Sequence, residues 1–235
     1  MLDQAFEALK TYDWGTDVAV LAPIDEAVVA TSGDSASREQ LERRLAAVLA
    51  EDVSRDAKDY VCRKLMAIGT AASVPALAAL LPSAELSHMA RFALERIPAP
   101  EAGQALREAL ASVAGSQKVG VVTSLAGRGE NESVAALARL VGDGDPAVAR
   151  AAVIGLGRIR TPEAARALES AKPADPQAKL EAIDARLACA EALLAAGKKA
   201  EALAVYKPLA GPQQPKHVRL GATRGMLAAS GKKAD

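Results

Sequence analysis

The chain has 235 residues, of which 50% are hydrophobic, 3% are aromatic and 25% are charged, and its formal net charge is zero. The apolar residues are mostly Ala and Leu, which favours packed helices because strands draw on β-branched and aromatic residues. No apolar run approaches the roughly 18 residues that a membrane-spanning helix needs. The composition therefore argues against a sheet-dominated fold and excludes a transmembrane helix.

The N-terminal region is predicted to form two helices, over residues 3–11 and 17–30, joined around Tyr12–Gly15. Pro23 is expected to kink or restart the second helix, because proline cannot continue a helical hydrogen-bond ladder. A polar turn over 31–36 then separates this region from the rest of the chain.

The remaining helical patterns form pairs separated by short turn signals, and such short connections force antiparallel neighbours. The predicted pairs are 38–50 with 54–68, 72–82 with 84–97, 100–112 with 116–128, 131–142 with 145–159, 162–171 with 177–196, and 199–210 with 215–230.

Two leucine series share one uneven period. Leu65, Leu94, Leu125 and Leu156 are 29, 31 and 31 residues apart, and Leu77, Leu106, Leu137 and Leu168 follow them at an offset of 12. Four residues before the first series stand Val61, Ala90, Val121 and Ala152, and three residues after it stand Ile68, Ile97, Arg128 and Ile159. This i, i+4, i+7 stripe is predicted to be the buried face of a helical repeat.

The segment DPAVARAAVIGLGRIRTPEAARALESA, residues 145–171, resembles a HEAT repeat, as do 68–81 and 217–230. The nearest type is the HEAT-like repeat of phycobilisome lyases. The stretches YDWG and SHMARFALERIP are similar to those of uncharacterised HEAT-repeat proteins of planctomycete-type bacteria. The resemblance implies an all-α fold, a right-handed α-solenoid of about six HEAT-type hairpins with an N-terminal helical cap.

The expected organisation has three parts. They are a cap over 1–36, a solenoid over 37–230 with units of about 38–68, 72–97, 100–128, 131–159, 162–196 and 199–230, and a frayed tail over 231–235.

HEAT solenoids usually bind partners on the concave face that their second helices form, so the resemblance places a candidate site there. In the register of the buried stripe, the solvent side holds eight candidate partner-binding residues: Arg63, His88, Phe92, Arg96, Thr123, Arg150, Ile154 and Arg158. The six second helices carry a net charge of +8. We therefore expect either a groove for an acidic segment of another protein or a solvated face that offsets the acidic N-terminus.

The two ends of the chain differ in charge. Residues 1–53 carry four basic and eleven acidic residues, whereas residues 198–235 carry eight basic and two acidic residues. This difference indicates either chance variation along a repeat protein, self-association through the charged ends, or an acidic partner at the C-terminal end.

Catalytic chemistry finds little support in the sequence. The two histidines, His88 and His217, lie far apart, and no local motif brings a nucleophile to a base. HEAT-type deoxyhypusine hydroxylases bind iron through His-Glu pairs, and the chain has no such dipeptide. Cys62 and Cys189 are expected to be small core residues. Trp14 is expected either to anchor the cap over the first repeat or to stack on a ligand. We therefore expect no metal, no cofactor and no enzymatic activity.

The predicted function is that of a non-enzymatic protein-binding scaffold or adaptor. The alternative is an accessory subunit of an enzyme complex, of the lyase type or redox or carbohydrate-active, and nucleic-acid binding is less favoured because the charge is balanced. The chain begins MLDQAFEALK, without the basic segment and apolar core of a signal peptide. We expect a soluble protein of unknown compartment, either cytoplasmic or exported after removal of a signal peptide.

Overall fold

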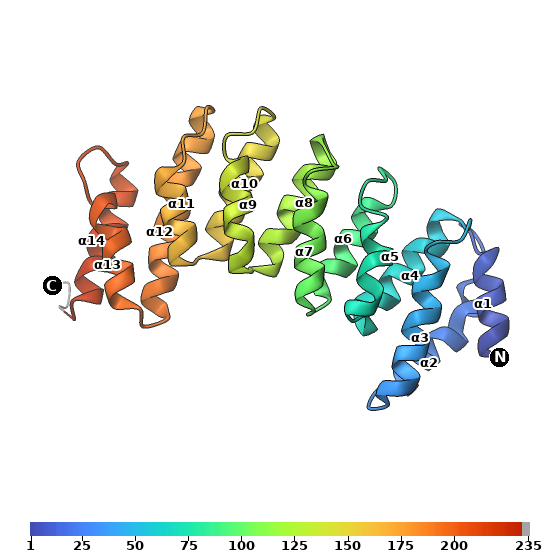
Figure 1. Cartoon of the computed structure of the whole chain (residues 1–235). Helices are drawn as coiled ribbons and strands as arrows, with labels where there is room; N and C mark the ends of the chain where they lie inside the picture. The colour runs from blue at the N-terminus through green and yellow to red at the C-terminus, as the bar shows by residue number, and fades with distance from the viewer. Residues whose placement is uncertain (232–235) are drawn as a thin grey trace. The chain divides into compact units, whose positions relative to one another are not determined.

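The computed structural model describes residues 1–231, which fold entirely into helices, turns and loops (Figure 1). The predicted all-α fold is thus confirmed. The chain divides into two compact units, Met1–Ser124 and Leu125–Asp235. Of the tail predicted over 231–235, all but Gly231 lies outside the described residues.

The first unit begins with the predicted cap helices and continues into helical pairs (Figure 1). Its α-helices are α1 (Leu2–Lys10), α2 (Ala22–Ala30), α3 (Ser35–Val48), α4 (Arg55–Ile68), α5 (Val74–Ala78), α6 (Ser87–Arg96), α7 (Pro100–Ala109) and α8 (Gly115–Arg128), within which the boundary falls. Two 3-10 turns, η1 (Val18–Leu21) and η2 (Ala71–Ser73), precede α2 and α5.

The second unit repeats the paired arrangement. Its elements are η3 (Asn131–Ser133), α9 (Val134–Leu140), α10 (Pro146–Ile159), α11 (Pro162–Ser170), α12 (Pro176–Ala195), α13 (Lys199–Leu209) and α14 (Lys216–Ala229).

Each unit has two layers of helices. In the first unit α4 packs on α6, while α5 packs on α3 and α7; in the second unit α10 packs on α12 and α12 on α14, while α9 packs on α11. The second helices of consecutive pairs therefore share one layer, and the first helices share the other.

The repeat leucines form the core, as predicted. All eight of them are at most 3% exposed, and the small residues four positions before the first series are fully buried. Burying a leucine side chain contributes about 1.5–3 kcal/mol, so this stripe fixes which side of each second helix faces solvent.

Several predicted boundaries were wrong by a few residues. Helix α3 begins at Ser35, inside the predicted polar turn, because the Asp34 carboxylate accepts hydrogen bonds from the backbone N–H groups of Ala36 and Ser37, each at 3.1 Å. The helix predicted over 72–82 shortens to α5, and its partner begins at Ser87. Pro23 does restart the second cap helix, since it lies in the first turn of α2.

A buried carboxylate joins α3 to the next helical pair. Glu42 is 1% exposed and accepts hydrogen bonds from the backbone N–H groups of Thr70 at 2.7 Å and Ser73 at 3.1 Å. The Ser73 and Thr70 hydroxyls donate to the same carboxylate, at 2.6 and 2.9 Å. These bonds satisfy both the charge and the free donors at the start of η2.

Two leucine substitutions compare the contributions of a core and a surface position to stability, and Leu156 on α10 is the fully buried one. Leu156→Ala should lower the free energy of unfolding by about 2–5 kcal/mol, because it leaves a cavity. Leu180→Ala on α12, where the side chain is 49% exposed, should change it by less than about 0.5 kcal/mol. Denaturant unfolding followed by circular dichroism measures both, and equal losses would contradict this assignment of the core.

Gly225 allows α14 to approach the buried ring of Tyr206 on α13, because a Cβ at this position would overlap that ring. Alanine favours a helix over glycine by about 1 kcal/mol, yet overpacking costs typically about 1–3 kcal/mol. Gly225→Ala should therefore destabilise the protein in thermal unfolding. The exposed Thr223 on the same helix is the control, since Thr223→Ala should have little effect, and a stabilised Gly225→Ala would refute the close approach.

Candidate functional site

The eight candidate residues of the second helices are all exposed, as the register of the buried stripe predicts. They divide between the two units. Thr123 belongs to neither of the two groups described below. Its hydroxyl donates to the Val119 carbonyl of its own helix at 2.9 Å. The remaining seven form two groups, each described within its own unit.

The first group, the Phe92 patch, consists of Arg63 on α4 and His88, Phe92 and Arg96 on α6. The His88 and Phe92 rings stack with centroids 6.4 Å apart, and the Arg96 guanidinium lies 5.4 Å from the Phe92 centroid. Phe92 remains 43% exposed. The patch borders a hollow of about 230 Å³, lined by Asp59, Cys62, Arg63, His88, Met89 and Phe92.

The second group, the Ile154 patch, consists of Arg150, Ile154 and Arg158, which follow one another at intervals of four along α10. Residues four apart are neighbours on a helix surface, so Ile154 lies between the two arginines and is 46% exposed.

Ion pairs engage half of the arginines in these patches. Arg63 donates from Nε to Asp59 at 2.9 Å, and Arg150 binds both oxygens of Glu181 on α12, at 2.8 and 2.9 Å from Nε. The hydrogen bond to Glu181 raises the pKa of Arg150. Arg96 and Arg158 make no ion pair among residues 1–231, so no carboxylate in this range neutralises their charge.

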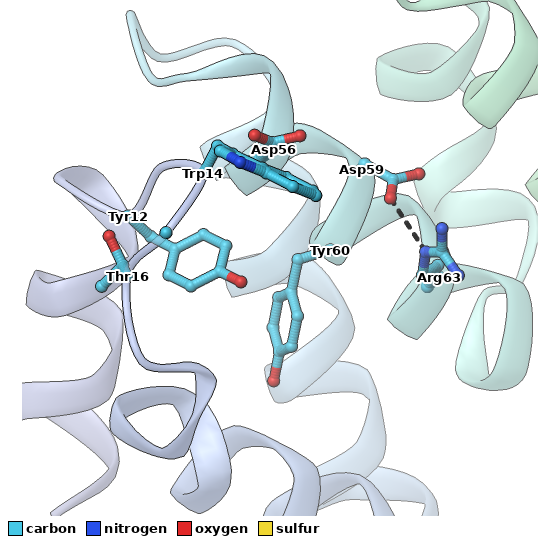
Figure 2. A pocket seen from close by; sticks show the side chains of 8 residues that line it. Tyr12, Trp14, Thr16, Asp56, Asp59, Tyr60 and Arg63 are labelled. Atoms are coloured by element: carbon cyan, nitrogen blue, oxygen red, sulfur yellow. Dashed lines mark hydrogen bonds and ion pairs between the residues drawn. The ribbon is translucent and has the colours of Figure 1, made fainter.

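Trp14 does not anchor the cap, and that prediction was wrong. Its side chain is 90% exposed, and the cap is joined to the first pair by Tyr60, whose hydroxyl bonds to Asp25 at 2.8 Å and to the Leu21 carbonyl at 3.2 Å. Figure 2 shows Trp14 at the mouth of a pocket with Tyr12 and Tyr60.

This pocket was not predicted from the sequence. The available signal was the dense aromatic stretch Tyr12–Trp14 in a chain with few aromatic residues. The third ring, Tyr60, is 46 positions away from Trp14 and gives no local signal.

The two cysteines are unpaired and buried, which confirms that they are core residues. Burial raises the pKa of Cys62 to about 12 and that of Cys189 to about 11. Among residues 1–231, no three His, Cys, Asp or Glu side chains are grouped so that they could hold a metal ion. No helix in the same range has the length and apolar character to cross a membrane.

Comparison with known proteins identifies the repeat. Residues 117–185 match the family model of HEAT repeats, so the predicted HEAT repeats are confirmed over this segment. No curated protein matches the chain.

Three solved structures illustrate what the whole chain is similar to. An engineered protein is 18% identical, with 97% of this chain and 69% of that chain covered and a TM-score of 0.42. A designed armadillo repeat protein is 18% identical, with 97% and 100% covered and a TM-score of 0.39. Human deoxyhypusine hydroxylase in complex with glycerol is 16% identical, with 98% and 96% covered and a TM-score of 0.35.

The burial of Cys62 and Cys189 generates a test of thiol reactivity. Because a raised pKa keeps both thiols protonated and only the thiolate is nucleophilic, iodoacetamide at pH 8 should leave both unmodified in the folded protein. Both should react in denaturant, and intact-mass spectrometry counts the added groups. Rapid modification of either cysteine under native conditions would contradict its burial.

Proposed function

We propose that this chain of HEAT-type helical repeats is a non-enzymatic scaffold that binds an acidic segment of another protein through the exposed face of its second helices. The observation that carries the proposal is the pairing of exposed apolar side chains with neighbouring arginines in each unit. Phe92 accompanies Arg96 on α6, and Ile154 accompanies Arg158 on α10.

The Phe92 patch supports the proposal through its chemistry. Aromatic residues, including Phe, and Arg are enriched at protein interfaces relative to the rest of the protein surface. The guanidinium of Arg96 lies close to the Phe92 ring. This contact orients the guanidinium but leaves its N–H groups available to a carboxylate, because the ring face attracts the cation without a bidentate hydrogen bond. A carboxylate of the partner can then be bound by Arg96 while an apolar side chain covers Phe92.

The Ile154 patch offers the same chemistry in the second unit. Glu181 holds Arg150 in place, so a partner carboxylate gains less from Arg150 than from Arg158. Arg158 is exposed on α10 one turn beyond Ile154. The patch therefore presents one free cation and one immobilised cation on either side of an apolar contact.

The rigidity of the scaffold favours binding. Ala152 and Leu156 are fully buried on the opposite side of α10, as are Ala90 and Leu94 on α6. The backbone that carries each patch is therefore ordered before a partner arrives, and association need not supply the free energy of ordering it.

The experiment compares charge reversal on the two helix layers. Arg96→Glu and Arg158→Glu should each weaken binding of a fluorescent oligo-glutamate peptide by roughly five- to tenfold at low salt, because a repulsive contact replaces an attractive one. Fluorescence anisotropy titration measures the affinity. The effect should shrink as salt is added, since ions screen exposed charges.

Arg139→Glu is the matched control, because Arg139 is exposed on α9, in the layer of first helices. It imposes the same change of net charge away from both patches and should leave affinity nearly unchanged. Arg150→Glu is avoided because it would place a second carboxylate against Glu181. If Arg139→Glu weakens binding as much as the two patch variants, net charge and not the exposed face of the second helices determines binding.

A further inference from the structure

Half of the aromatic residues of the chain lie in one pocket of the first unit. The chain has one Trp, three Tyr and two Phe, and Tyr12, Trp14 and Tyr60 line a single hollow of about 440 Å³. Asp56, Asp59 and Arg63 complete its polar lining, together with Gly15 and Thr16. In Figure 2 the indole of Trp14 lies above the rings of Tyr12 and Tyr60, with the Asp56 and Asp59 carboxylates beside it.

A tight turn holds Trp14 in this exposed position. The Asp13 carboxylate accepts the Trp14 backbone N–H at 2.8 Å, and the Thr16 N–H donates to the Asp13 carbonyl at 3.0 Å. Gly15 has φ +87°, a left-handed conformation that favours glycine. The Ser54 hydroxyl also donates to the Tyr12 carbonyl, which ties the turn to the start of α4. The indole is therefore presented by an ordered loop although 90% of the residue is exposed.

The two tyrosine rings provide the inner walls. Their centroids are 6.3 Å apart and their planes are inclined by 50°, so they meet at an angle and do not stack. Tyr60 is fixed by its hydroxyl bonds to Asp25 and Leu21. Lys64 contacts its ring with Nζ 4.5 Å from the centroid, but Lys64 is not among the residues that line the pocket.

The charges around the pocket favour a cationic ligand. Two carboxylates face one guanidinium in its lining, and Arg63 is engaged by Asp59 at 2.9 Å. Within residues 1–231, Asp56 pairs only with Arg55, at 3.4 Å, and the Arg55 side chain is 59% exposed, so this pair is weak.

We propose that Tyr12, Trp14 and Tyr60, with Asp56 at their edge, form an aromatic cage for an organic ammonium group. Ring faces carry partial negative charge and attract cations, most strongly on Trp, and recognition of quaternary ammonium groups uses such cages. Two tyrosine rings inclined by 50° and an indole above them can contact a compact cation from more than one side, whereas a flat sugar ring or a base would need one open platform. The ammonium belongs either to a free quaternary amine or to a methylated lysine side chain.

The cage is independent of the proposed protein-binding patches. Arg63 belongs to the Phe92 patch and also lines the pocket, but Asp59 already engages it. The residues on which the two proposals rest are different, because Arg96 and Arg158 do not line the pocket. Loss of ammonium binding would leave the binding of an acidic peptide in place, and the converse also holds.

Trp14 is the sole tryptophan of the chain, so its fluorescence reports on the cage directly. Choline should produce a saturable change of Trp14 emission, with sodium chloride added to keep ionic strength constant. The neutral isostere 3,3-dimethylbutan-1-ol should produce at least about fivefold weaker binding, because it has the same shape but no charge for the ring faces to attract.

Tyrosine variants separate ring chemistry from apolar bulk. Tyr12→Leu should weaken choline binding by about threefold or more, whereas Tyr12→Phe, which keeps the ring face, should bind nearly as the wild type does. Asp56→Asn should also weaken binding. Circular dichroism verifies that each variant is folded, and because the Tyr12→Phe control keeps the loop packing, a loss confined to Tyr12→Leu reports on the ring.

A peptide arm distinguishes the two sources of the ammonium. A short peptide with one trimethyllysine should compete with choline, and the same peptide with acetyllysine should not. If the trimethyllysine peptide binds the cage at a lower concentration than choline does, the ligand is a methylated lysine of a protein partner. If the peptide needs a higher concentration than choline, the ligand is a free amine. Equal binding of choline and its neutral isostere, an unsaturable emission change, or wild-type affinity in Tyr12→Leu would each overturn the proposal.

Discussion

Burial of one stripe per second helix is the constraint on which the rest of the structure depends. A small residue, a leucine and a further residue three positions on recur on consecutive helices, and nearly all of them are withdrawn from solvent. Once Leu94 and Leu156 are buried, helical geometry places Phe92 and Ile154 on the outer side. Burial of the stripe therefore determines which residues of each second helix are exposed. This holds within each unit taken by itself.

Buried polar contacts and one close glycine contact add to the helix packing that leucine burial provides. Glu42 satisfies the donors at the start of η2, and Arg186, 8% exposed, is matched by Glu169 at 2.6 Å. Gly225 permits the Tyr206 ring to lie against α14. A buried charge without such a partner would cost several kcal/mol, so these sites fix the register of neighbouring helices while the leucines supply most of the apolar contact.

Periodicity was sufficient to predict the helices, the buried stripe and the exposure of all eight candidate residues. It failed where the answer depends on residues distant in sequence. Arg150 meets Glu181 across 31 positions, so the charge sum of the second helices gave no sign that this arginine is already paired. Trp14 was expected to anchor the cap, yet the local Asp13–Gly15 turn directs it outward. The Tyr60 ring completes the pocket from another helix, which spacing alone does not reveal.

Arginine footprinting is the decisive experiment, because it shows which helix layer an acidic partner covers. The purified protein is treated with phenylglyoxal with and without bound oligo-glutamate, and modified residues are mapped by mass spectrometry. If the second helices form the binding face, Arg96 and Arg158 should be protected, and modification of Arg139 and Arg166, on first helices α9 and α11, should be unchanged. Protection of Arg139 and Arg166 with continued modification of Arg96 and Arg158 would contradict it.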